Sequence, residues 1–152
     1  MLFLVRHAEA VDETLALHDA DRHLTAAGRA AARALGERLR WYDCLPIAVW
    51  SSPLMRAVQT AELLIAGLGW TGVVECVPAL APGGATREVC ALVEKAGGVV
   101  IAVGHEPGLS AIGTVITGRA DFPALQKSEA ARVDTGRLKW LLLPTDEEPR
   151  KP

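Results

Sequence analysis

The strongest constraint on the fold is an apolar run near position 100, Val99-Val100-Ile101-Ala102-Val103, which lies between Gly97-Gly98 and Gly104. A continuous apolar run, most of it β-branched, predicts a short strand that is buried on both faces. Such strands are typical of the centre of a parallel sheet that has helices on both sides. The run therefore indicates an α/β fold with this strand near the middle of the sheet.

Short apolar segments and amphipathic segments alternate along the rest of the chain. This alternation, followed by two strands around Asp134-Thr135-Gly136, predicts a three-layer α/β/α sandwich with a mostly parallel central sheet and an antiparallel edge. Thr25 is expected to be the N-cap of the first helix, and Ser52 that of the second, with Pro53 at its first position. The expected strands are 1–5, 47–50, 73–77, 99–103, 129–134 and 137–143, and the expected helices are 25–42, 53–68, 86–96 and a helix that starts within 104–108 and ends near 117.

The size and charge of the chain limit its domain organisation and its partners. The 152 residues, half of them apolar, suffice for one domain with a substantial core, which we expect over residues 1–146. Residues 147–152 form a charged, proline-containing tail that is expected to be disordered. The net charge of −2 gives no general attraction to nucleic acid or to a membrane surface. No window reaches the about 20 apolar residues of a membrane span, so neither kind of partner is expected.

The cysteines indicate the redox compartment. Cys44, Cys76 and Cys90 are odd in number, far apart, and form no Cys-x-x-Cys pair, which argues against a disulfide framework or a zinc knuckle. The first residues do not resemble a signal peptide, because the apolar run is short and Arg6 follows it. We therefore expect buried free thiols in a cytoplasmic protein.

Basic side chains follow three of the predicted strands. Arg6 and His7 come directly after the first strand, Arg56 lies in the first turn after the second, and His105 follows the central one. The carboxyl ends of parallel strands meet at one edge of a sheet, so these side chains are expected to converge. A cation near a helix N-terminus opposes the helix dipole, so Arg56 is better explained by a bound anion than by structure alone.

Two histidines and two arginines around one cleft suit a tetrahedral dianion such as phosphate. One imidazole can attack phosphorus while the guanidinium groups and the second imidazolium neutralise the phosphoryl oxygens. No carboxylate cluster, P-loop or HExxH motif accompanies them, so no metal and no cofactor is expected. The simpler alternative for each residue is a solvated polar side chain at a strand end.

Four sequence segments follow one another along the chain in a telling order: Arg6-His7-Ala8-Glu9, Leu24-Thr25-Ala26-Ala27-Gly28, Ser51 to Ala61 and Val103 to Gly108. Together they resemble the signatures of the histidine phosphatase superfamily, also called phosphoglycerate-mutase-like, and the chain most resembles its small bacterial phosphohistidine phosphatase branch. This resemblance implies that His7 is the nucleophile, that Arg6 and Arg56 bind the phosphoryl group, and that His105 donates to one of its oxygens.

The chain departs from the family pattern in two places. Ala8 and Ala10 occupy positions where the family often has Gly and a hydroxyl residue, so fewer hydroxyl contacts to phosphate are expected. Many members carry a Glu general acid after the third strand, whereas Leu80 to Pro82 contains no acid. The candidates for a general acid are Glu9, Asp12 and Asp21 in the long loop that follows the first strand.

The missing acid bears on the substrate. An alcohol leaving group needs a well-placed proton donor, whereas the imidazole of phosphohistidine is a better leaving group. We therefore expect a metal-independent phosphatase that acts on phosphohistidine in proteins through a phosphohistidine intermediate. The alternatives are a phosphomonoesterase for a small phosphorylated metabolite, and a non-catalytic phosphate-binding module. A mutase is disfavoured because the short chain lacks an evident lid.

Overall fold

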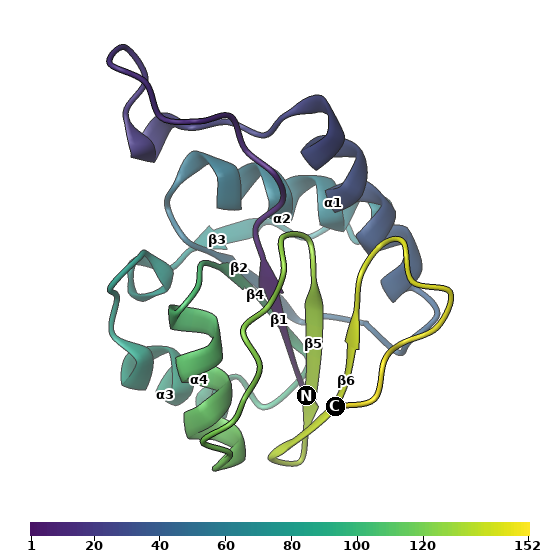
Figure 1. Cartoon of the computed structure of the whole chain (residues 1–152). Coiled ribbons are helices and arrows are strands. Elements are labelled where there is room, and N and C mark those ends of the chain that lie inside the picture. The colour runs from purple at the N-terminus through teal and green to yellow at the C-terminus, as the bar shows by residue number, and fades with distance from the viewer.

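The computed structural model describes residues Met1 to Pro152, which form one six-stranded sheet between two pairs of helices (Figure 1). The strand order is β3-β2-β4-β1-β5-β6. The loop between β1 and α1 projects beyond the strand ends at the top of Figure 1. The strands are β1 (Leu2–Arg6), β2 (Ala48–Ser51), β3 (Val74–Cys76), β4 (Val100–Gly104), β5 (Ala130–Asp134) and β6 (Arg137–Leu142); the α-helices are α1 (Ala26–Leu39), α2 (Met55–Leu68), α3 (Thr86–Ala96) and α4 (Gly108–Thr117); short 3-10 turns lie at Asp19–Asp21 and Pro78–Leu80.

The sheet has a parallel part and an antiparallel edge. β4 pairs in parallel with both β1 and β2, and β3 pairs in parallel with β2. β5 runs antiparallel to β1, and β6 runs antiparallel to β5. The predicted α/β/α architecture, with a mostly parallel sheet and a terminal hairpin at one edge, is therefore confirmed.

The apolar runs of β1 and β4 are buried on both faces of the sheet, as their composition predicts. Leu4 and Ala102 point into one apolar core, which includes residues of α3 and α4. Phe3 and Ile101 point into the other, which is built with α1 and α2. All four side chains have no solvent exposure. Side chains alternate between the faces of a strand, so a continuous apolar run fills both cores.

Of the two helix starts that were predicted from N-cap residues, the structure confirms one and contradicts the other. The Thr25 hydroxyl accepts a hydrogen bond from the Gly28 amide at 3.0 Å, so this predicted N-cap is confirmed. The prediction for Ser52 is wrong, because α2 begins at Met55 after an N-cap Leu54 that makes no side-chain bond. The Ser52 amide instead continues the sheet by donating to the Val103 carbonyl at 2.9 Å.

The structure also bears on the expectations for the cysteines, for membrane-spanning segments and for the C-terminal segment. Cys44 and Cys90 are buried free thiols, but Cys76 is exposed, so the expectation that all three are buried is wrong for Cys76. No helix in the structure has the length and apolar character needed to cross a membrane. In the segment 147–152, Arg150 forms a backbone bridge with Leu141 of β6; disorder of this segment stays a prediction.

Helices α1 and α2 approach each other closely where both have a glycine. A Cβ atom on Gly36 of α1 would lie 2.0 Å from the Leu64 carbonyl oxygen, and one on Gly67 of α2 would lie 2.1 Å from the Arg33 carbonyl oxygen. Both neighbours are helix backbone, so neither can move without separating the helices. The close packing of α2 against α1 fixes the helix that carries Arg56.

Gly36→Ala is expected to destabilise the fold by about 1–3 kcal/mol, because the added methyl group forces the two helices apart. Urea unfolding of the variant and the wild type measures the difference. Gly108→Ala is the matched control, since a Cβ there meets nothing within 4 Å. Equal stability of Gly36→Ala and wild type would contradict this packing argument.

Candidate active site

The register of β1 against β4 brings the two predicted histidines together. Arg6 is opposite Gly104 in the parallel pair, and the His7 amide donates to the Gly104 carbonyl at 3.1 Å. His7 and His105 therefore follow neighbouring strand ends, and their ring centroids are 5.0 Å apart. Their exposed fractions are 7% and 6%, so both rings lie in a recess at the carboxyl edge of the sheet.

Helix α2 joins Arg56 to the same edge through Thr60. The buried Thr60 hydroxyl donates to the Arg56 carbonyl at 2.6 Å and accepts from the Ala8 amide at 3.0 Å. The hydroxyl therefore links the residue after His7 to the first turn of α2. The Arg56 side chain is itself buried, with 5% exposure. Sequence reasoning did not identify Thr60 as part of the site, because its contact with Ala8 spans 52 positions.

The hydrogen bonds of His7 define its tautomer. Its Nδ1 lies 2.7 Å from the Ala8 carbonyl oxygen, which can only accept a hydrogen bond. Nδ1 therefore carries the proton, and Nε2 of the neutral ring has a free lone pair. Nε2 makes no hydrogen bond within the protein and is not fully buried. This is the protonation state that a nucleophilic imidazole requires.

Burial and nearby cations keep His7 neutral. Burial lowers the pKa of His7 from 6.5 to about 4; the hydrogen bond to Ala8 opposes this shift, and the positive charges of Arg56, Arg6 and Lys127 add to it. At neutral pH the ring is therefore uncharged, and the three nearby cations favour this neutral form. The two arginines that the sequence analysis predicts to bind phosphate thus also help to keep the His7 ring neutral.

His105 is held by a hydroxyl group and is also neutral in the free site. Its Nε2 lies 2.8 Å from the Ser52 hydroxyl, a contact that explains why Ser52 is buried. Burial lowers the pKa of His105 to about 3, with further lowering by His7, Arg56 and Arg6 and an opposing effect of Asp19. A bound dianion would reverse the balance of charge around the ring and favour its protonated form.

The site holds most of the buried side-chain polar atoms that have no hydrogen-bond partner in the molecule. Buried side-chain nitrogen or oxygen atoms without a hydrogen-bond partner occur at four positions: Nε of Arg6, Nε of Arg56, Nδ1 of His105 and Nε of Arg132. Three of these four belong to residues predicted from the sequence to bind phosphate. Unpaired buried polar groups are costly and rare in folded proteins, so this concentration indicates a place for an anion.

Asp19 contacts Arg56 and was missed by the sequence analysis. The Arg56 guanidinium donates to the Asp19 carbonyl at 2.7 Å and to its carboxylate at 3.2 Å. Arg22 donates to the other carboxylate oxygen at 3.0 Å. The hydrogen bond from Arg22, with that from Arg56, holds the pKa of the Asp19 carboxyl below its usual range. Asp19 is therefore ionised at neutral pH and has no proton to donate as a general acid.

The predicted general-acid candidates make no contact with the histidines. The exposed Glu9 carboxylate accepts a hydrogen bond from the Thr25 hydroxyl at 2.7 Å and so faces the start of α1. Asp12 and Asp21 are exposed, and their carboxylates make no hydrogen bond or ion pair within the protein. A general-acid role for any of the three stays a prediction. Leu80 lies in the segment where the family resemblance would place a general acid. It is buried, and together with His105 it lines a hollow of only about 10 Å³.

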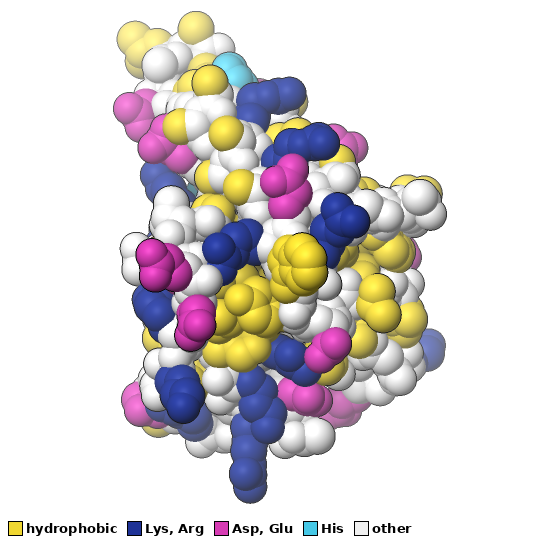
Figure 2. Space-filling view, turned by 90° about the vertical axis from the view of Figure 1, so that its right-hand side faces the viewer, with side chains coloured by type: hydrophobic (Ala, Val, Ile, Leu, Met, Phe, Trp, Pro, Cys, Tyr) yellow, Lys and Arg dark blue, Asp and Glu magenta, His cyan; other side chains and the backbone are white.

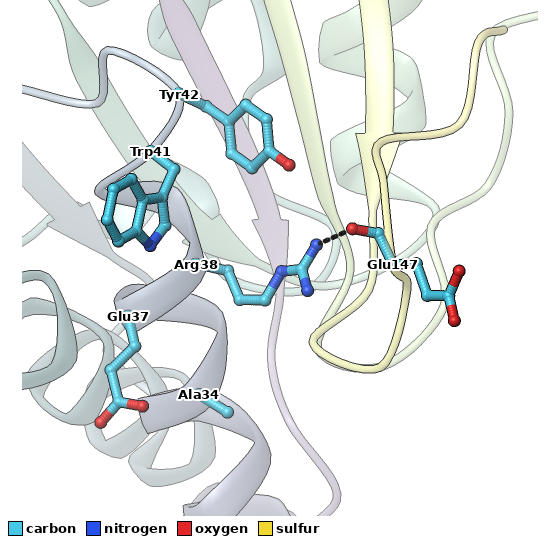
Figure 3. A pocket seen from close by; sticks show the side chains of 6 residues that line it. All are labelled: Ala34, Glu37, Arg38, Trp41, Tyr42 and Glu147. Carbon is cyan, nitrogen blue, oxygen red and sulfur yellow. Dashed lines mark hydrogen bonds between the residues drawn. The ribbon is translucent and has the colours of Figure 1, made fainter.

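A hollow larger than the one beside His105 lies near the C-terminal end of α1, away from the two histidines. Figure 2 shows hydrophobic side chains in the middle of this face, with charges of both signs around them. Trp41, which is 84% exposed, and Tyr42 line the hollow beside Arg38 and Glu147 (Figure 3). Arg38 lies in the last turn of α1, and Trp41 and Tyr42 follow that helix. The 14 residues of α1 span about 20 Å from the helix start near Glu9. No predicted site residue lines this hollow.

Comparison with known proteins defines the class. Residues 2–81, more than half of the chain, match the model of the histidine phosphatase superfamily (branch 1). The chain belongs to this superfamily, and its enzyme class is that of a phosphatase, a hydrolase. It is also 34% identical over 113 residues to an uncharacterized protein of Picosynechococcus sp. (strain ATCC 27264 / PCC 7002 / PR-6), covering 71% of this chain and 67% of that protein.

Solved structures share the fold over nearly the whole chain. The protein histidine phosphatase SixA complexed with tungstate has a TM-score of 0.85 and 24% identity, covering 94% of this chain and 96% of that one. A protein of Agrobacterium tumefaciens assigned as a phosphohistidine phosphatase SixA has a TM-score of 0.82 and 22% identity, with 94% and 97% covered. A mycobacterial glucosyl-3-phosphoglycerate phosphatase is more distant, with a TM-score of 0.64, 21% identity and coverage of 86% and 87%.

Acid is expected to destabilise the fold through the two buried histidines. Their pKa values of about 4 and about 3 in the folded protein lie below the value near 6.5 of an unfolded chain, so the unfolded chain binds more protons in this interval. The contribution of the two histidines to the free energy of unfolding is complete above about pH 6.5. It is lost as the pH falls toward their folded-state pKa values of about 4 and about 3. Urea unfolding at about pH 7 and about pH 5 measures the difference.

His105→Gln is expected to reduce this pH dependence, because an amide does not titrate. His18→Gln, at an exposed position of the long loop, is the matched control and should retain the wild-type dependence. An unchanged dependence in His105→Gln would contradict the assignment of a buried neutral ring.

Proposed function

We propose that the protein is a metal-independent phosphatase that forms a phosphohistidine intermediate at His7 and acts preferentially on phosphohistidine in proteins. The observation that carries this proposal is the His7 ring, neutral and with its Nδ1 proton donated to the Ala8 carbonyl, which leaves the Nε2 lone pair available. Arg6 and Arg56 supply unpaired Nε–H groups, and His105 has an unpaired ring nitrogen.

The proposed reaction has two displacement steps. First, His7 Nε2 attacks phosphorus, and the bond from phosphorus to the substrate imidazole breaks; the leaving nitrogen takes a proton from solvent. Water then attacks the phosphoryl group on His7, loses a proton, and releases inorganic phosphate, which restores the neutral ring. Arg6 and Arg56 neutralise the phosphoryl oxygens in both steps, and His105 donates to one of them. These residues supply the positive charge that a metal ion would otherwise supply.

One feature favours a phosphohistidine substrate over an alcohol ester. Asp19, the acid that pairs with Arg56 and acts on the charge of His105, is ionised, so it cannot protonate an alcohol leaving group as a general acid must.

Incubation with a ³²P-labelled phosphohistidine protein is expected to transfer an acid-labile label to the enzyme. His7→Ala should abolish the label, because the attacking nitrogen is gone, and Arg56→Ala should slow labelling by about a hundredfold or more. EDTA should leave the wild-type rate unchanged. Binding of phosphate without any label, in wild type as in His7→Ala, would instead indicate a non-catalytic phosphate-binding module.

Substrate preference is tested by comparing kcat/KM for a phosphohistidine peptide, a phosphoserine peptide and a sugar phosphate. The phosphohistidine peptide is expected to be hydrolysed fastest, since its imidazole leaves without a dedicated acid. Faster hydrolysis of the sugar phosphate would show that the protein is a small-molecule phosphomonoesterase and would contradict the substrate assignment.

A further inference from the structure

The segment 125–129 runs beside the end of β1 and contacts both of its site residues. The Arg6 guanidinium donates to the Leu125 carbonyl at 2.8 Å, and the Arg6 amide donates to the Glu129 carbonyl at 3.1 Å. The Ser128 amide donates to the His7 carbonyl at 3.3 Å. Lys127, within the same segment, is one of the cations that lower the pKa of His7. The position of this segment therefore determines the position of the Arg6 guanidinium.

The shape of this segment depends on the buried carboxylate of Glu129. Its side chain is only 2% exposed. One carboxylate oxygen accepts a hydrogen bond from the Gln126 amide at 2.6 Å and closes the turn. Ser128, inside the turn, has a φ of 61°, which is unfavourable for a residue other than glycine. The turn is thus maintained by a charged group that is removed from water.

Arg150 supplies the only ion-pair partner of Glu129. Its guanidinium donates to the other Glu129 carboxylate oxygen and also pairs with Asp146 at 3.0 Å. Two backbone hydrogen bonds, at 2.8 and 2.9 Å, join Arg150 to Leu141 of β6 and fix the position of the side chain. A buried carboxylate without its cation is strongly unfavourable, so loss of Arg150 would make the 125–129 turn rearrange to reach water.

We propose that Arg150 is a positioning residue for the phosphate site: through Glu129 it fixes the 125–129 turn, and through that turn it fixes the Arg6 guanidinium. The assignment rests on the proposed function, because Arg6 is taken as a phosphate ligand. It connects the segment after β6 to the end of β1, two parts of the chain that are remote in sequence. Arg150 itself touches neither His7 nor His105.

Inorganic phosphate binding, measured by calorimetry on the full chain, tests this role without any turnover. Arg150→Ala should weaken phosphate binding about tenfold, roughly the value of one hydrogen bond from a charged group to the anion. The KM for the phosphohistidine peptide should rise in parallel. Arg38→Ala is the matched control, because Arg38 donates to the Glu147 carbonyl and binds the same segment without touching Glu129 (Figure 3). It should bind phosphate within about twofold of wild type.

A second variant keeps the test decisive if Arg150→Ala folds poorly. Glu129→Gln with Arg150→Ala removes the buried charge but keeps an oxygen for the Gln126 amide, so phosphate affinity should return to within about threefold of wild type. Wild-type affinity in a folded Arg150→Ala would overturn the proposal. Equally weak binding in the double variant would also overturn it. If wild type binds phosphate but never becomes labelled, the proposed phosphatase chemistry fails while the role of Arg150 is still measured.

Discussion

The parallel pairing of β1 with β4 is the constraint on which the rest of the site depends. Because Arg6 and Gly104 are opposite each other, the residues that follow them leave the sheet side by side and in the same direction. A slip of one residue would turn His7 or His105 toward the opposite face of the sheet. The register is fixed by alternating apolar side chains that fill two separate cores. The stability of the core and the spacing of the two imidazoles therefore have the same origin.

The positive charges of the site favour a bound anion and also favour the neutral form of His7. Buried guanidinium groups attract an anion, and the same groups, together with burial, prevent protonation of His7. Thr60 fixes the separation between Arg56 and the segment that carries His7, since its hydroxyl donates to the Arg56 carbonyl and accepts from the Ala8 amide. A single hydroxyl on α2 thus joins the segment that carries His7 to the helix that carries Arg56. Small movements of α2 would shift both together rather than separate them.

Much of this arrangement can be predicted from the sequence, because strand ends follow from apolar periodicity. The runs at Leu2–Arg6 and Val100–Gly104 define two parallel strands, and the residues after them must meet at one edge. The roles of these residues stay predictions until they are tested. Ser52 shows a limit of this reasoning: Ser-Pro is a common helix start, but here the serine extends the sheet and bonds His105. The contact of Asp19 with Arg56 follows from the path of an irregular loop, which no periodicity specifies.

The ion pair between Asp19 and Arg56 also has a consequence for selectivity. The empty site is not a bare positive pocket, because a resident carboxylate already occupies one side of the Arg56 guanidinium. An incoming anion must exchange with that carboxylate or share the arginine with it. A singly charged anion gains little from such an exchange, whereas a doubly charged phosphoryl group gains about twice the Coulomb attraction. The Asp19 carboxylate thus reduces the net positive charge that the empty site presents, and this reduction weakens the attraction of a singly charged anion more than that of a dianion.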